Sequence, residues 1–153
     1  MTDKSVPMAT VNDILAKKGS QVLSIDPQSS AHAAVLVMNT HNVGALVVLD
    51  DLVIVGLFTE RDLMRRVVCE RRDASATRVA DVMTRNVCCA RTDMTIEEAR
   101  AVMKERRVRH LPILSGSNRL VGVVSIGDLN AWEIEHQEME LQYLHEYLYG
   151  QVA

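Results

Sequence analysis

The sequence predicts an α/β (α+β) fold in which two copies of one β-α-β-β-α unit are followed by a C-terminal helical extension. Three observations predict it. A pattern of residues recurs at an offset of 65 to 66 positions, which indicates an internal repeat. Within each copy, segments of helical spacing alternate with short β-branched runs. Apolar residues make up 48% of the chain and aromatic residues only 3%, so the core is expected to be aliphatic.

The repeat sets the expected domain boundaries. We expect a flexible N-terminus over 1–9, a first repeat over 10–72 and a polar linker over 73–78. A second repeat then covers 79–130, and a helical tail covers 131–153. The aligned pairs that support this division are Ala34 and Ala99, Met38 and Met103, Val43 and Val108, Gly56 and Gly122, and Asp62 and Asp128.

The first copy is predicted from its periodicity. Apolar residues at helical spacing predict a helix over 29–41, and two β-branched runs joined by Asp50-Asp51 predict a hairpin. The predicted elements are a strand over 21–25, the helix over 29–41, strands over 45–49 and 52–58, and a helix over 60–72.

The second copy repeats this order with a longer last helix. Thr95 and Glu98 have the spacing of a capping box at a helix start. The predicted elements are a strand over 87–90, a helix over 95–107, strands over 110–114 and 119–125, and a helix over 126–149. A short helix precedes each copy, at 11–19 and at 78–84.

A hydroxyl and an aspartate stand three residues apart at the same place in both copies, where a strand ends and a helix begins. Thr59 and Asp62 form the first pair, and Ser125 and Asp128 form the second. One interpretation is helix capping, with the hydroxyl at the N-cap and the carboxylate at N3. The other is ribose binding, because an ionised carboxylate offers two acceptor oxygens to a vicinal diol. A carboxylate turned towards a ribose cannot also reach back to its cap, so for each aspartate the two interpretations compete.

These segments together resemble a known family. The stretches "NVGALVVLDDLVIVGLFTERDL" (42–63) and "RVRHLPILSGSNRLVGVVSIGDL" (107–129), with "DVMT" (81–84) before the second, resemble a tandem pair of CBS domains, named for cystathionine β-synthase. The chain looks most similar to small stand-alone bacterial CBS pairs. The resemblance implies two repeats packed pseudo-symmetrically through their sheets, with clefts between them that bind AMP, ADP, ATP, NAD(H) or S-adenosylmethionine.

The resemblance also implies which residues bind the ligand. In CBS domains the aspartate of this motif holds the ribose, and the hydroxyl three residues earlier lies beside the ligand. The resemblance therefore assigns Asp62 with Thr59 and Asp128 with Ser125 to ribose binding.

The resemblance further implies that basic residues just before the second strand of the unit contact phosphates. Arg107, Arg109 and His110 occupy that place in the second copy, with Arg107 more simply explained as a solvated side chain, whereas the first copy has no basic group there. Arg61 is a further phosphate candidate, because it follows Thr59 at the helix start. It has no basic counterpart in the other copy, where Gly127 replaces it, and a solvated helix face is the alternative interpretation. Neighbouring residues on a strand point to opposite faces, so Arg109 and His110 should contribute differently.

Several other functions are not indicated by the sequence. A net charge of −3 argues against non-specific nucleic-acid binding, and neither a signal sequence nor a membrane-spanning run is evident. Cys69, Cys88 and Cys89 lack a metal or disulfide spacing, which favours reduced thiols in the cytoplasm. Glu133 and His136 have a spacing found in helical metal sites but lack a second such pair, so no metal is expected.

The sequence therefore predicts a non-catalytic nucleotide sensor, without catalytic residues, that acts on a separate protein or serves as a nucleotide buffer. Alternatives are an S-adenosylmethionine-binding module, a structural dimer with vestigial clefts, and a nucleotide-converting enzyme with His110 as its base. Apolar residues along the tail, including Trp132 and Tyr143, favour a homodimer.

Overall fold

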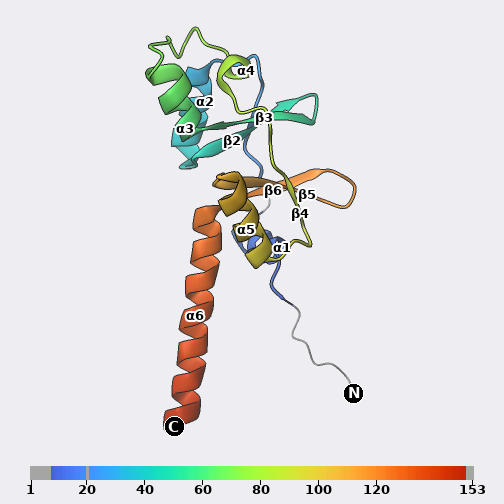
Figure 1. Ribbon diagram of the computed structural model, residues 1–153, viewed down its shortest axis with the longest axis vertical. Helices are drawn as coiled ribbons and strands as arrows, with labels where there is room; N and C mark the ends of the chain where they lie inside the picture. The colour runs from blue at the N-terminus through green and yellow to red at the C-terminus, as the bar shows by residue number, and fades with distance from the viewer. Residues whose placement is uncertain (1–7, 20, 151–153) are drawn as a thin grey trace. The chain divides into compact units, whose positions relative to one another are not determined.

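The computed structural model describes residues 8–19 and 21–150, and the chain divides into two compact units (Figure 1). The first, called here the central unit, comprises Gln21–Cys89. The second, the terminal unit, combines the N-terminal segment with the residues from Ala90 onwards. Each unit has its own three-stranded sheet, which confirms the predicted α/β class and the presence of two repeats.

The central unit is a small mixed sheet with helices beside it. Its strand order is β1-β2-β3, with β1 parallel to β2 and β2 antiparallel to β3. In chain order its elements are β1 (Ser24–Ile25), α2 (Ala31–His41), β2 (Ala45–Asp50), β3 (Val53–Thr59), α3 (Glu60–Asp62), the π-helical turn η1 (Leu63–Val68) and α4 (Val79–Val82).

The terminal unit repeats this topology. Its strand order is β4-β5-β6, again with one parallel and one antiparallel pairing. In chain order its elements are α1 (Val11–Lys18), β4 (Ala90–Arg91), α5 (Ile96–Arg106), β5 (His110–Leu114), β6 (Leu120–Ser125) and α6 (Ile126–Tyr149). In Figure 1, most of α6 extends beyond the other elements of its unit.

Three predicted elements differ from the structure. The expected strands over 21–25 and 87–90 begin late, at Ser24 and Ala90, because β1 and β4 each pair with the next strand over only two residues. The helix predicted over 60–72 is α-helical only at its start. From Leu63 it widens, and the Cys69 N–H bonds the carbonyl of Met64, five residues earlier, at 2.9 Å.

The core of the central unit is aliphatic, as predicted, with Phe58 as its single aromatic side chain. It includes buried residues from α2, β2, β3, η1 and α4: Ala31, Ala34, Met38, Leu46, Val48, Phe58, Val67, Val79, Val82 and Met83. Burial of these apolar groups is the main force that holds the layers of the unit together.

The two short helices dock on the repeat that they do not precede. In the central unit, the Val79 N–H at the start of α4 bonds the carbonyl of Ser29, just before α2, at 2.8 Å. In the terminal unit, the Val11 N–H at the start of α1 bonds the carbonyl of Met94, just before α5, at 2.9 Å. The compact units therefore cross the boundaries drawn from the sequence repeat, which remain a prediction.

The N-terminus was expected to be loosely docked over residues 1–9. Most of this segment lies outside the described residues. Ala9 is described, and its carbonyl accepts a hydrogen bond from the Ile96 N–H at 3.1 Å, continuing the contact between the start of α1 and the start of α5.

The three cysteines are free thiols. Cys69 is exposed, and Cys88 and Cys89 are partly buried. Burial raises the pKa of the Cys89 thiol, and the neighbouring Cys88 raises it further. Both effects favour the protonated, less nucleophilic form of Cys89.

Candidate functional site

Both hydroxyl–aspartate pairs form complete capping boxes. In the central unit, Thr59 Oγ1 accepts from the Asp62 N–H at 3.2 Å, and Asp62 Oδ2 accepts from the Thr59 N–H at 3.0 Å. In the terminal unit, Ser125 Oγ accepts from the Asp128 N–H at 3.1 Å, and Asp128 Oδ2 accepts from the Ser125 N–H at 2.8 Å. The capping interpretation is therefore confirmed for both pairs. Each carboxylate turns only Oδ2 back to its cap, so capping and ribose binding compete for one oxygen and not, as expected, for the whole carboxylate.

Asp62 is buried, with 5% of its surface exposed, and both of its oxygens are occupied. The Thr84 hydroxyl lies 2.9 Å from Oδ1 and 3.1 Å from Oδ2, and the Thr59 hydroxyl lies 3.1 Å from Oδ2. Arg66 Nε lies 3.8 Å from Oδ1, at ion-pair distance. Asp62 thus joins the start of α3 to the segment that follows α4.

Asp128 is more accessible, with 22% of its side chain exposed. Lys18, at the end of α1, donates to Asp128 Oδ2 at 2.7 Å and to the carbonyl of Val123 at 3.0 Å. The Ser125 N–H and Lys18 both bond Oδ2. The other oxygen of this partly exposed carboxylate, Oδ1, therefore takes no part in the cap or in the contact with Lys18.

A glycine in each sheet allows the short helix to approach the site. A Cβ on Gly56 would lie 2.6 Å from Met83 Sδ, and a Cβ on Gly122 would lie 2.5 Å from Leu15 Cδ2. Met83 and Leu15 stand at corresponding positions, at the end of α4 and within α1. Just beyond them come Thr84 and Lys18, the residues that contact the two aspartates.

Sequence reasoning did not identify Thr84 or Lys18 as site residues. A usable signal was present, because Asp13-Ile14-Leu15 and Asp81-Val82-Met83 align as the cores of the two short helices. The alignment does not show that each short helix packs against the repeat that it does not precede.

The phosphate candidates fall in different units. In the terminal unit, His110 is the cross-strand partner of Ser125, and the Arg109 carbonyl accepts from the Ile126 N–H at 2.8 Å. Both residues therefore lie at the end of the hairpin that leads to Asp128. The Arg109 side chain is exposed and His110 is partly buried. Arg61 is exposed at the start of α3 in the central unit, beside Thr59 and Asp62.

Comparison with known proteins decides the family. The pattern of the CBS domain matches residues 11–69 and again residues 79–134. The chain belongs to the CBS-domain family. The predicted tandem CBS pair is therefore confirmed, and as such a pair the chain is of a regulatory class whose modules are in general not catalytic.

Relatives and solved structures agree with this assignment. The CBS pair is 34% identical over 122 residues to the CBS domain-containing protein YhcV of Bacillus subtilis, covering 80% of this chain and 84% of that protein. Its fold is similar to the crystal structure of the CBS domain protein NE2398, at 38% identity and a TM-score of 0.79, covering 83% of this chain and 98% of the other.

A more distant structure contains ligands. The CBS domain pair of protein MJ0100, in complex with 5'-methylthioadenosine and S-adenosyl-L-methionine, has a TM-score of 0.75 at 22% identity, covering 85% of this chain and 99% of the other. At this identity the similarity to the CBS pair shows the fold alone.

Two further properties of the CBS pair follow from the described residues. Within them, no cluster of three or more His, Cys, Asp or Glu side chains is arranged to hold a metal ion. Likewise, none of the described helices combines the length and the apolar character that crossing a bilayer requires.

Proposed function

We propose that this CBS pair is a cytoplasmic, non-catalytic sensor that binds an adenosyl nucleotide and signals the bound state to a separate protein. The observation that carries the proposal is the carboxylate of Asp128. Ser125 and Lys18 hold it at a helix start through Oδ2, while Oδ1 lies outside these contacts and 22% of the side chain is exposed. Oδ1 can accept a hydrogen bond from a ribose hydroxyl, and hydrogen bonds to a charged group contribute about 1.5–3 kcal/mol each.

The surroundings of Asp128 suit the rest of a nucleotide. Arg109 and His110 lie at the same end of the β5–β6 hairpin and are the proposed phosphate contacts. Ser125 Oγ accepts from the Asp128 N–H, so its own hydroxyl proton is available to a ligand oxygen. The terminal unit thus supports the primary site.

The central unit supports a second site that needs a rearrangement. Asp62 is bonded on both oxygens, so a ribose hydroxyl would replace the Thr84 hydroxyl as donor. The exchange conserves the number of hydrogen bonds to the carboxylate, and Thr59 remains as the cap. Arg61 is the proposed phosphate contact. Release of Thr84 would loosen the segment after α4, which gives ligand binding a structural consequence.

Calorimetric titration tests the proposal. AMP, ADP, ATP, NADH and S-adenosylmethionine should be compared, with CMP as the control that keeps ribose and phosphate but lacks adenine. We expect saturable binding of at least one adenosyl ligand and a higher Tm. At a free ligand concentration of 100 times Kd, the free energy of unfolding should rise by about 2.7 kcal/mol.

The same titration separates the alternatives. Binding of S-adenosylmethionine alone would assign the module to that ligand, as in the MJ0100 complex. Absence of binding by every ligand would overturn the proposal and leave a structural dimer. Chemical conversion of a bound nucleotide, followed by chromatography, would contradict a non-catalytic sensor and direct attention to His110.

We also propose that α6 mediates a homodimer. Its outer part carries exposed apolar residues at spacings of seven, three and four, which form a stripe typical of helix pairing. These residues are Ile134, Leu141, Leu144 and Leu148. The start of the helix is tied to its own unit instead, because Arg100 donates to Asn130 and Glu133 at 2.9 Å.

Truncation after Gln137 tests this proposal while keeping the Arg100 contacts. We expect the full chain to be a dimer by light scattering and the truncated chain to be a monomer with little change in Tm. The double variant Leu141→Gln/Leu148→Gln should have the same effect without shortening the helix. Leu52→Gln, which changes an exposed leucine in the β2–β3 turn, is the matched control. An unchanged dimer after truncation would contradict the role of α6.

A further inference from the structure

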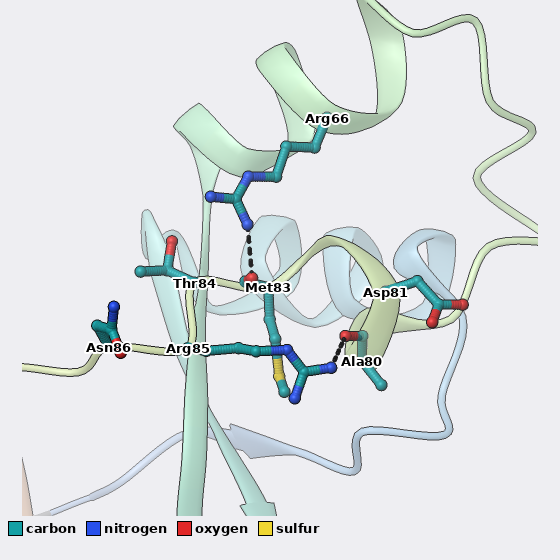
Figure 2. A pocket seen from close by; sticks show the side chains of 7 residues that line it. All are labelled: Arg66, Ala80, Asp81, Met83, Thr84, Arg85 and Asn86. Atoms are coloured by element: carbon teal, nitrogen blue, oxygen red, sulfur yellow. Dashed lines mark hydrogen bonds between the residues drawn. The ribbon is translucent and has the colours of Figure 1, made fainter.

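The central unit contains a pocket whose lining includes only one residue of the nucleotide assignment above, Thr84. It lies between η1, α4 and the segment after α4, with a volume of about 430 Å³ (Figure 2). That size falls within the range of about 300–1,000 Å³ found for small-molecule sites. The polar residues that line it are Arg66, Asp81, Thr84, Arg85 and Asn86.

Two arginines are oriented in the pocket by backbone carbonyls. Arg66 reaches from η1 and donates through Nη1 to the Met83 carbonyl at 2.6 Å. Arg85 extends along the opposite side and donates through Nη2 to the Ala80 carbonyl at 2.9 Å (Figure 2). A guanidinium carries several N–H donors, so one carbonyl contact orients each group and leaves donors available to a ligand.

The charges around the pocket leave a positive excess. The carboxylate of Asp81 is paired with Arg78, whose Nε and Nη2 lie 3.3 Å from its two oxygens. Asp62 lies 3.8 Å from Arg66 and offsets part of its charge. Arg85 forms no ion pair with any described acidic residue. Three guanidinium groups therefore face two carboxylates, and the remaining positive charge is centred on Arg85.

The segment that carries Arg85 supplies further donors. Within the described part of the chain, the backbone N–H groups of Arg85 and Asn86 donate no hydrogen bond. The side-chain amide of Asn86 likewise makes none there, and it is exposed. The lining thus combines two differently directed guanidinium groups with a segment rich in donors, a set of groups that suits a ligand with several acceptor oxygens on one centre.

We propose that this pocket binds a phosphate group through Arg66 and Arg85. The inference stands on contacts within the central unit and does not rest on the proposed nucleotide function. The phosphate can come from a nucleotide whose ribose approaches Asp62, which Thr84 connects to the pocket. It can also come from inorganic phosphate or pyrophosphate as a separate ligand.

Titration at constant ionic strength tests the proposal. Inorganic phosphate and pyrophosphate are the probes, and acetate is the control anion. We expect saturable binding of phosphate, detected by calorimetry and by shifts of the arginine Nε–H resonances. Arg66→Gln and Arg85→Gln should each weaken it about tenfold or more, because each removes charge-assisted hydrogen bonds.

Arg65→Gln is the matched control, because Arg65 neighbours Arg66 on η1, is exposed and does not line the pocket. It should leave phosphate affinity unchanged. Arg85→Gln guards against a folding artefact, because Arg85 is exposed and its substitution should leave Tm unchanged. Equal phosphate affinity in the wild type and in Arg85→Gln would overturn the proposal, as would an equal loss in Arg65→Gln.

A comparison of AMP with adenosine identifies the source of the phosphate. If Arg85→Gln weakens AMP but not adenosine, and phosphate competes with AMP, the pocket serves the phosphate of the nucleotide. If phosphate and AMP bind together with unchanged affinities, phosphate is a separate ligand. If no adenosyl ligand binds, the proposed nucleotide function fails, and the phosphate titration still decides the present inference.

Discussion

Asp62→Ala is expected to lower the free energy of unfolding by about 3 kcal/mol, and Asp128→Ala by about 1 kcal/mol. The two aspartates have the same place in the repeat but different surroundings. Removing the buried carboxylate of Asp62 leaves the Thr59 N–H and the Thr84 hydroxyl without their acceptor. Removing the carboxylate of Asp128 leaves the Ser125 N–H to be hydrated by solvent, and Lys18 stays bonded to the Val123 carbonyl.

Ligand binding should rank the same variants in the opposite order. Because Asp128 is partly exposed and its Oδ1 is not used by the cap, Asp128→Ala should weaken the nucleotide affinity about tenfold or more, and Asp62→Ala should have the smaller effect per folded molecule. Urea unfolding measures the stability and calorimetry measures the affinity.

Asparagine variants are the matched controls for this pair. An amide oxygen can still accept from the cap N–H, so Asp62→Asn and Asp128→Asn should lose less stability than the alanine variants. The charge is lost in both cases, so Asp128→Asn should still weaken ligand binding. Equal stability losses in the two alanine variants would contradict the difference in burial. If Asp128→Ala binds nucleotide with wild-type affinity, the Asp128 carboxylate acts only as a helix cap.

Gly56→Ala is expected to lower the free energy of unfolding by about 2–3 kcal/mol, whereas Gly122→Ala should lower it by about 1 kcal/mol. The new methyl group at Gly56 would lie 2.8 Å from the Thr84 carbonyl oxygen as well as 2.6 Å from Met83 Sδ. Thr84 cannot retreat easily, because it exchanges two backbone hydrogen bonds with Leu57, at 2.8 and 2.9 Å.

At Gly122 the three atoms nearest to the new methyl group all belong to the side chain of Leu15, whose far end can change rotamer. Gly116→Ala is the control, because nothing lies within 4 Å of a Cβ there and its effect should stay within about 0.5 kcal/mol. Urea unfolding of the three variants measures the differences. A loss at Gly122 that equals or exceeds the loss at Gly56 would show that the backbone of the segment after α4 yields more easily than a leucine side chain.

Most of the local structure was predictable, because its causes are local. Alternating β-branched runs produced both hairpins, and helical spacing predicted α2 and α5 almost to the residue. Thr59 and Ser125 were correctly placed as N-caps, since a hydroxyl at a strand-to-helix junction can bond the N–H three residues later. At Thr95 only the first half of the predicted box forms, with the hydroxyl accepting from Glu98 N–H at 3.1 Å.

The candidate site was predictable only in part. The four residues of the hydroxyl–aspartate pairs follow from the repeat, whereas the pairing of His110 with Ser125 comes from the register of β5 and β6. The contacts that distinguish the two aspartates do not follow from the repeat. Thr84 lies 22 positions from Asp62 in the chain and Lys18 lies 110 from Asp128, so no local pattern connects them.

The sequence by itself determined the repeat, the order of strands and helices, the capping residues and the membership of the CBS-domain family. These depend on periodicity and on hydrogen bonds between near neighbours in the chain. Only the tertiary structure decided which short helix serves which sheet, because that choice depends on packing between distant segments, Met83 against Gly56 and Leu15 against Gly122. The choice buries Asp62 under Thr84 and leaves Asp128 accessible beside Lys18, so two equivalent positions in the sequence become two different sites.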